Sequence, residues 1–274
     1  MIIDTHAHVN FNAFKDDADE VIRRALNEKI WLINVGSQYS TSKRAVEMAA
    51  KYSEGVYAAV GLHPIHLETG LVKIKEDPQE VQFQTKEETF DYEKYKELAK
   101  SKKVVAIGEV GFDYYWKPKT QKKLADFQQK QRDIFHSQLE LAQELDLPLI
   151  IHCRMAHDQL LEAICSHRDK LRGVLHCHTA NWEKTKECLD TEFYFGFNGL
   201  IFKMPSSEEV IKNLPLEKIL VETDAPYLTP PQEEGRNEPI YIKHVVSRIA
   251  QIKGLSYEKV AEATTQNAKN LFKI

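Results

Sequence analysis

The sequence predicts a single (β/α)8 barrel, or TIM barrel, with an extra helix at its C-terminus, over residues 1–274. Eight short apolar runs alternate with longer stretches of helical period, which predicts repeated βαβ units. Eight such units in 274 residues fit the usual length of a barrel. Polar residues also gather at the C-terminal ends of the runs. In a doubly wound open sheet, the competing fold, the outer strands would hold these residues too far apart to converge.

The first half of the chain supplies four of the predicted strands. Each strand is a short apolar run, and the helices between them repeat apolar residues every three or four positions. In order, the elements are strand Met1–Val9, helix Asp17–Lys29, strand Trp31–Gly36, helix Thr41–Lys51, strand Val56–Leu62, helix Tyr92–Lys100 and strand Val104–Val110. The polar stretch 68–91, which contains Pro78, is interpreted as an insertion or a long loop within the one domain.

The second half repeats the same alternation. In order, the elements are helix Thr120–Leu145, strand Leu149–Cys153, helix Asp158–Ser166, strand Gly173–His178, helix Trp182–Leu189, strand Phe193–Gly199, helix Ser206–Asn213, strand Lys218–Thr223 and two closing helices, Ile240–Ile252 and Ser256–Leu271. The closing pair is one helix more than eight βα units need.

Composition limits the class of protein. The chain has 37 basic and 41 acidic residues, a formal charge of −4, which excludes a globally basic nucleic-acid binder but not a local basic patch. The hydrophobic fraction is 42%, and no apolar run is long enough to span a bilayer. We therefore expect a cytoplasmic protein with no membrane partner and no obligate protein partner. Its four cysteines are expected to be free thiols.

Polar side chains of metal-binding type end six of the eight predicted strands. They are His6 and His8, His63, Glu109, His152, His176, and Glu222 with Asp224. Because the C-terminal ends of barrel strands meet at one rim, we expect these groups to converge at the mouth. Residues two apart on a strand face the same way, so His6 should point with His8 and Glu222 with Asp224.

The donors suit two ions better than one. Six protein ligands are too many for a single tetrahedral catalytic ion with an open position. The six are His6, His8, Glu109, His152, His176 and Asp224. Glu109 is the natural bridging carboxylate, because its strand lies between the two groups in chain order. Imidazole and carboxylate ligands are compatible with Mg, Mn, Zn, Ni or Fe. Cys153 and Cys177 follow two of the histidines and are expected to turn toward the helices and pack there.

Six motifs give the chain a resemblance to the TatD-related metal-dependent hydrolases of the amidohydrolase-like superfamily. The motifs are DTHAH (4–8), GLHP (61–64), IGEVGFDYY (107–115), PLIIHCR (148–154), VLHCH (174–178) and VETDAPYLTP (221–230). The resemblance implies one ion held by His6, His8, Glu109 and Asp224, and a second held by Glu109, His152 and His176. It also implies that His63, Asp113 and Arg154 contact substrate or orient ligands, and we place Glu222 with this group.

The sequence departs from the family pattern in one motif. The family usually has an aromatic residue and a glycine after the His-Cys pair, whereas this chain has His178, Thr179 and Ala180. His178 is expected either to be a polar rim residue or to add a donor near the second ion.

The resemblance implies a deoxyribonuclease that removes nucleotides from the ends of DNA, with single strands or 3′ ends as substrate. A hydroxide bridging the two ions would attack the phosphodiester, with Glu109 and Asp224 as catalytic residues. Asp224 would either shuttle the proton or act as a simple ligand. An ester or lactone hydrolase, or an aminoacyl-tRNA deacylase, is the alternative, because the same hydroxide would attack a carbonyl. A non-enzymatic metal-storage protein is the least favoured reading, since storage has no need of an open mouth.

Several further residues are expected on the rim. Tyr114, Tyr115 and Trp116 would either stack on a base or pack in their loop. Arg154 would either bind a phosphate or pair with Asp158 or Glu222. The remaining candidates are Arg236 and Asn237, for phosphate binding or loop fixing, and the basic run Lys117, Lys119, Lys122 and Lys123, for guiding a strand end.

Overall fold

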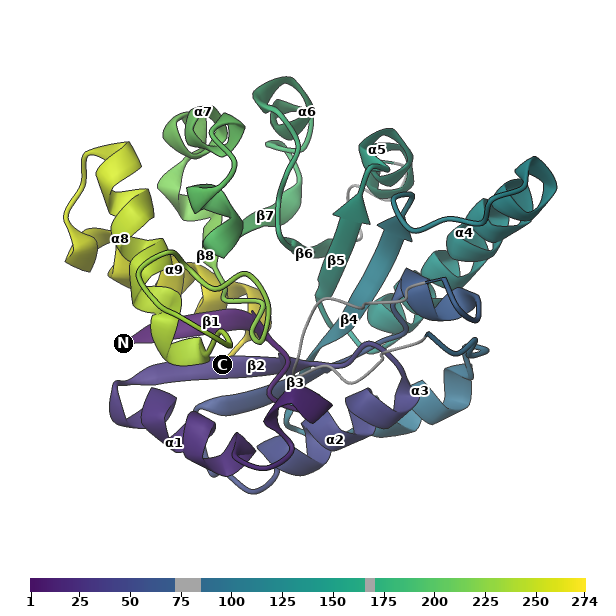
Figure 1. Cartoon of the computed structure of the whole chain (residues 1–274), viewed down its shortest axis with the longest axis horizontal. Helices are drawn as coiled ribbons and strands as arrows, with labels where there is room; N and C mark the ends of the chain where they lie inside the picture. The colour runs from purple at the N-terminus through teal and green to yellow at the C-terminus, as the bar shows by residue number, and fades with distance from the viewer. Residues whose placement is uncertain (72–84, 166–170) are drawn as a thin grey trace.

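The protein is described by a computed structural model that covers residues 1–71, 85–165 and 171–274. Its eight strands form one parallel sheet in the order β1 to β8, with helices along the outside (Figure 1). The strands are β1 (Ile2–Ala7), β2 (Ile30–Val35), β3 (Val56–Val60), β4 (Val104–Asp113), β5 (Leu149–Arg154), β6 (Arg172–Leu175), β7 (Glu192–Phe197) and β8 (Ile219–Val221). The predicted barrel is therefore confirmed.

The helices follow the predicted order. The α-helices are α1 (Ala18–Asn27), α2 (Tyr39–Ala49), α3 (Tyr92–Ala99), α4 (Gln121–Glu144), α5 (His157–Cys165), α6 (Trp182–Lys186), α7 (Ser206–Asn213), α8 (Ile242–Lys253) and α9 (Tyr257–Phe272). Short 3-10 helices are η1 (Asn12–Phe14), η2 (Pro64–Leu67), η3 (Gly199–Phe202), η4 (Leu216–Lys218) and η5 (Pro239–Tyr241). None of the helices in the described parts of the chain is long and apolar enough to cross a membrane.

Helix α9 is the extra helix that the sequence predicts. It packs Leu271 and Phe272 into a cluster with the buried strand residues Ile3, Ile33 and Leu220. The Thr265 hydroxyl donates to the carbonyl of Met1 at 3.0 Å, and the Asn267 amide donates to the carbonyl of Ile219 at 2.8 Å. These bonds attach α9 to the starts of β1 and β8, so the helix covers the end of the barrel opposite the mouth.

Strands β6 and β8 are shorter than predicted. They end at Leu175 and Val221, before the polar residues that follow them. Cys177 and Asp224 then adopt left-handed backbone conformations, with φ of 46° and 58°. Alternation of side chains therefore stops before these residues, and the expectation that Glu222 and Asp224 point together is wrong. Strand β4 instead continues three residues beyond its predicted end, to Asp113.

The stretch 68–91 falls largely on residues 72–84, which lie outside the described residues. Its two flanks lie side by side. Gly70 donates its N–H to the carbonyl of Thr85 at 2.8 Å, and Leu71 donates to the Thr85 hydroxyl at 2.9 Å. Glu88 also donates its N–H to the carbonyl of His66 at 2.8 Å, so this segment begins and ends at the same place beside η2.

The barrel closes between β1 and β8 through individual hydrogen bonds. Asp224 donates its N–H to the carbonyl of His6 at 2.8 Å, and His8 donates to the carbonyl of Ala225 at 2.7 Å. The buried carboxyl of Asp4 contacts the Thr223 N–H at 2.9 Å and the Thr223 hydroxyl at 2.5 Å. Burial raises the pKa of Asp4 to about 8, although the Thr223 contacts oppose the shift. The closure therefore favours a protonated Asp4.

Asp4→Asn should keep this closure and remove its pH dependence. Because the folded-state pKa of Asp4 is raised, its contribution to stability is full below about pH 4 and is lost as pH rises through about 8. The free energy of unfolding of the wild type should therefore fall relative to the variant by up to about 1.4 kcal/mol per pH unit across that window. Denaturant unfolding of both proteins from pH 5 to 8, under identical metal conditions, measures the difference. Parallel profiles would contradict the raised pKa.

Candidate metal centre

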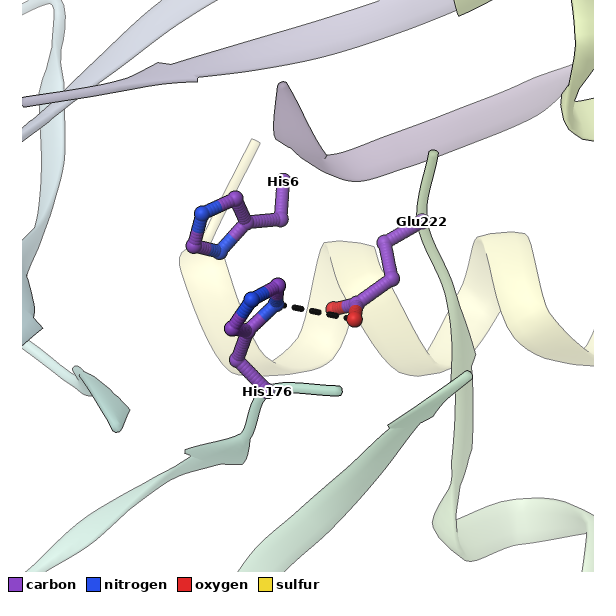
Figure 2. A group of neighbouring side chains, drawn as sticks. All are labelled: His6, His176 and Glu222. Carbon is purple, nitrogen blue, oxygen red and sulfur yellow. Dashed lines mark ion pairs between the residues drawn. The ribbon is translucent and has the colours of Figure 1, made fainter. Parts of the chain in front are cut away.

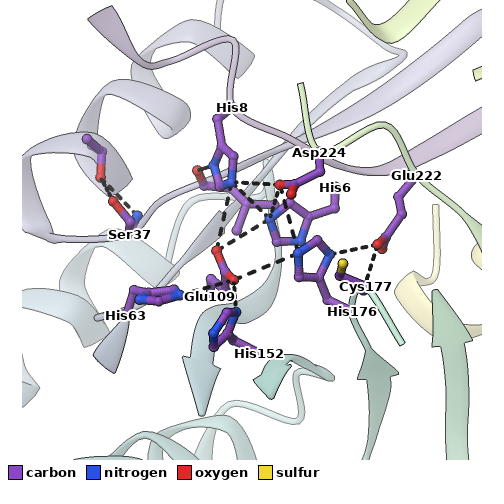
Figure 3. A network of polar contacts seen from close by, with 12 residues as sticks. His6, His8, Ser37, His63, Glu109, His152, His176, Cys177, Glu222 and Asp224 are labelled. Carbon is purple, nitrogen blue, oxygen red and sulfur yellow. Dashed lines mark hydrogen bonds and ion pairs between the residues drawn. The ribbon is translucent and has the colours of Figure 1, made fainter. Parts of the chain in front are cut away.

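The strand ends bring the predicted donors together at the mouth of the barrel (Figure 3). Glu109 lies on β4 and stands in the middle of the group. The Nε2 atoms of His6 and His8 lie 3.1 Å apart. Glu109 Oε2 is 3.5 Å from the first of these atoms and 3.8 Å from the second. Asp224 Oδ1 is 3.8 Å and 3.4 Å from the same two atoms, so two nitrogens and two carboxylate oxygens face one point.

The tautomer of His8 and the neutral state of His6 suit a cation at that point. Nδ1 of His8 lies 2.8 Å from the carbonyl of Val35, which can only accept, so Nδ1 carries the proton and Nε2 carries a lone pair. Burial, followed by the neighbouring His176, lowers the pKa of His6 to about 4, so this ring is neutral. Two imidazoles and two carboxylates buried this closely are the donor set of a divalent transition metal.

The other oxygen of Glu109 faces a second group of histidines. Oε1 lies 2.9 Å from His152 Nδ1 and 3.9 Å from His176 Nε2. The far nitrogen of His152, Nε2, lies 3.1 Å from Asp113 Oδ2. Burial alone would lower the pKa of His152, but its contacts with Asp113 and Glu109 outweigh burial and raise the pKa to about 9. In the absence of a metal, a proton on His152 therefore takes the place of a cation between the two acceptors.

His176 is oriented from behind by Glu222. Its Nδ1 lies 2.8 Å from Glu222 Oε1, while its ring stacks on His6 at 3.5 Å between centroids (Figure 2). This contact turns Nε2 toward the centre, 3.8 Å from Asp224 Oδ1. Burial opposes protonation of His176, but Glu222 and Asp224 raise its pKa to about 10. A carboxylate behind a ligating histidine fixes the tautomer and increases the basicity of the ligand.

Glu222 does not lie where the sequence places it. Its side chain has no exposed surface and is not among those lining the cavity. It accepts hydrogen bonds from the Cys177 N–H at 2.7 Å and from the Asn198 amide at 3.0 Å. Gly196 on β7 leaves the space for this carboxylate, because a Cβ at that position would collide with it. We therefore replace the predicted substrate contact of Glu222 with a positioning role.

His63 faces Glu109 but is poorly suited to bind a metal. Its Nδ1 accepts a hydrogen bond from the Ile65 N–H at 3.0 Å, so the proton of the neutral ring is on Nε2. Nε2 lies 3.4 Å from Glu109 Oε1 and can donate to it. Burial would raise the pKa of Glu109, but His63, His6 and His152 together hold it well below its usual range. The bridging carboxylate is therefore ionised.

A cavity of about 730 Å³ opens above these groups. That volume is within the range typical of ligand sites. Of the residues predicted to contact substrate, His63, Asp113 and Arg154 line the cavity. Lys15 and Arg44 also line it, and the sequence analysis missed them. Neither belongs to a recognisable motif, and the only signal was their position soon after the predicted ends of the first two strands.

The rim beyond β4 and β5 carries an aromatic platform made of the exposed Tyr115 and the half-buried Trp116. The Arg154 guanidinium lies over the Tyr115 ring at 3.7 Å, and Tyr115 meets Trp116 edge to face. Arg154 pairs with neither predicted acid, because Asp158 is bound to Lys184 and Glu222 is buried elsewhere. Asp113 Oδ1 accepts the N–H groups of Tyr115 and Trp116 at 2.9 and 3.0 Å. The same carboxylate therefore connects this platform to His152.

Arg236 and Asn237 fix the loop after β8. Arg236 forms an ion pair with Asp17, 2.5 Å from Nη2 to Oδ2, and its guanidinium also lies over the Phe14 ring at 4.0 Å. Asn237 donates to the carbonyls of Thr223 and Tyr227 at 2.9 and 2.6 Å. Of the two predicted roles, the structure supports loop fixing.

The altered His-Cys motif turns two side chains differently from the prediction. The left-handed backbone at Cys177 places this residue beside His176 (Figure 3), where it lines the cavity. Cys153 packs against the core as predicted, but it also lines the cavity. His178 does not line the cavity, so it is not placed to add a donor near the second ion. Its Nε2 lies 2.8 Å from the Thr185 hydroxyl. Cys153, Cys177 and Cys188 are free thiols.

Comparisons with known proteins agree with this arrangement. The chain is 38% identical to an uncharacterized metal-dependent hydrolase, YabD, of Bacillus subtilis, over the full length of both proteins. It is 32% identical to the 3′-5′ ssDNA/RNA exonuclease TatD of Escherichia coli K12, across 100% of this chain and 99% of that protein. The crystal structure of YJJV, a TatD homolog from Escherichia coli K12, superposes with a TM-score of 0.84 at 26% identity, covering 100% of this chain and 98% of the other.

The sequence profile of the TatD related DNase family matches residues 3–273. This match spans both groups of donors and, apart from the first residue of β1, all eight strands of the barrel. The chain therefore belongs to the TatD-related DNase family of metal-dependent hydrolases.

Proposed function

We propose that this protein is a 3′-5′ exonuclease that hydrolyses the terminal phosphodiester of single-stranded nucleic acid, DNA in particular, with two divalent cations. The observation that carries the proposal is the convergence of six donors, with Glu109 at their centre, beneath a cavity that is also lined by Lys15, Arg44 and Arg154. Relatives named as 3′-5′ ssDNA/RNA exonucleases at about 32% identity support the substrate and the polarity.

The donors fit two cations that share Glu109. One would be held by His6, His8, Glu109 and Asp224, and the other by Glu109, His152 and His176. Two such cations activate water and neutralise the charge that develops on the phosphate oxygens. The chain supplies the rest of the chemistry. Burial would raise the pKa of Asp224, but His176 and the other histidines around it keep the pKa below its usual value. Asp224 is therefore ionised at neutral pH and able to accept a proton from the attacking water.

The residues behind the donors hold them in position. His63 Nε2 lies 3.4 Å from Glu109 Oε1, Asp113 fixes the outer nitrogen of His152, and Glu222 fixes that of His176. On the rim, Arg154 can bind the scissile phosphate, and Trp116, which lines the cavity, can stack on a base, a contact worth about 1–3 kcal/mol.

A phosphodiester suits this cavity better than a neutral ester or lactone. Lys15, Arg44 and Arg154 all line the cavity, and a neutral substrate would leave the three cations without an anionic partner. The proposal therefore ranks nucleic acid above the carbonyl substrates that the same donors could also serve.

The function can be tested by metal restoration. Metal-free protein, returned to Mg, Mn or Zn, should shorten 5′-labelled single-stranded DNA one nucleotide at a time. Glu109→Gln should lower kcat at least about a hundredfold and reduce the bound metal, because the bridging charge is lost. Glu97→Gln, an exposed glutamate on α3, is the matched control and should behave as wild type. Rapid turnover of an aryl ester or lactone with no nuclease activity under any metal would overturn the proposal.

Metal binding should release protons. His152 and His176 have pKa values raised to about 9 and 10, so both are protonated at neutral pH without metal and must lose a proton to become ligands. Metal affinity should therefore rise with pH until both rings have lost a proton, at about pH 10. Calorimetric titration with Mn in two buffers of different ionisation enthalpy, at pH 7.5, should show about two protons released. Binding without proton release would contradict these protonation states.

Glu222→Gln separates a positioning role from a substrate contact. Loss of the charge behind His176 should lower metal affinity about 10–100-fold, as measured by competition with a chromophoric chelator. A substrate contact would instead raise KM and leave metal affinity unchanged. Glu217→Gln, an exposed glutamate just before β8, is the control and should change neither quantity.

A further inference from the structure

The acidic and the basic residues that line the cavity have different surroundings. The acids among them, Glu109, Asp113 and Asp224, are all engaged in the metal centre. The remaining charged lining residues in the described chain are Lys15, Arg44 and Arg154, and all three are basic. This distribution indicates an anionic ligand larger than the single phosphate that the centre itself would hold.

The three basic residues lie on two sides of the centre. Lys15 directly follows η1, which comes after β1, and Arg44 lies on α2, which follows β2. Arg154 is the last residue of β5. In a ring of eight strands taken in order, β5 lies opposite β1. The pair Lys15 and Arg44 therefore faces Arg154 across the donors.

None of these three cations is neutralised within the described chain. Arg44 donates from one nitrogen to Asn12 Oδ1 at 2.8 Å, which leaves most of its N–H groups available. The Arg154 guanidinium lies over the face of Tyr115 and forms no ion pair within the described residues, and the Lys15 ammonium makes no hydrogen bond or ion pair there. Arginines that do pair with a carboxylate are Arg24, Arg172, Arg236 and Arg248.

We propose that Lys15 and Arg44 form a second phosphate site, which binds the phosphate one nucleotide upstream of the scissile one. This inference rests on the proposed function. The strand that is retained after cleavage carries a phosphate at every nucleotide, so it suits the side with two unpaired cations. The terminal nucleotide carries a base and no further phosphate, so it suits the side with Tyr115, Trp116 and Arg154. The strand then crosses the mouth with the scissile bond over the centre.

The test removes the charge either from one linkage of the substrate or from the two basic side chains of the proposed site. One single-stranded DNA decamer is compared with the same decamer bearing an uncharged methylphosphonate at the linkage next to the terminal phosphodiester. The metal-loaded wild type should have a kcat/KM at least about tenfold lower on the neutral linkage, because a charge-assisted contact is lost. The Lys15→Ala, Arg44→Ala double variant should be slower on the charged decamer and should no longer distinguish the two.

The ratio of the two rates is independent of the amount of folded enzyme, so partial misfolding of a variant cannot imitate the result. Lys43→Ala removes a lysine next to Arg44 on α2 that pairs with Glu47 and lies outside the cavity, and it should keep the wild-type ratio. A double variant that discriminates as well as wild type would overturn the second site. Failure of the wild type to cleave either decamer would instead overturn the proposed function.

Discussion

The join between the first and last strands is the constraint on which the rest of the molecule depends. The backbone bonds that close the barrel belong to the residues that carry the donors: His6 accepts from Asp224, and His8 donates to Ala225. Separating β1 from β8 would therefore separate two histidines from their carboxylate. Asp4 and Thr223, one step further into the barrel, reinforce the same join with a buried side-chain contact. Fold and site share one set of hydrogen bonds.

Control of protons is the second principle of the centre. Behind His8, His152 and His176 stand, in that order, a backbone carbonyl, Asp113 and Glu222. Each of these partners engages one nitrogen of the ring. The other nitrogen is therefore the one that faces the centre of the site. Burying so many ionisable groups is unfavourable unless their charges are matched. The pKa of His6 is lowered and that of His152 is raised, so the protonation state of each buried histidine depends on its nearest neighbours.

Much of this arrangement could be predicted from the sequence. The strand order and the convergence of His6, His8 and Glu109 follow from polar residues at the ends of apolar runs. The positions of Glu222 and Cys177 could not be predicted, because alternation fails where the strand has already ended and φ becomes positive. Lys15 and Arg44 were missed for a different reason. These two residues reach the cavity because the loop after β1 and helix α2 pass close to the mouth of the barrel. No local sequence pattern predicts that position.

Strand β7 supplies no donor to the centre, yet its Gly196 sets a limit on the site. The missing side chain is what gives the Glu222 carboxylate room behind His176. Even alanine at this position would push that carboxylate away from the ring it orients. In a survey of natural variants, position 196 should thus behave like a functional residue although it has no functional group. A substitution at Gly196 would act through Glu222, so its effect could not be predicted from the residues that contact metal or substrate alone.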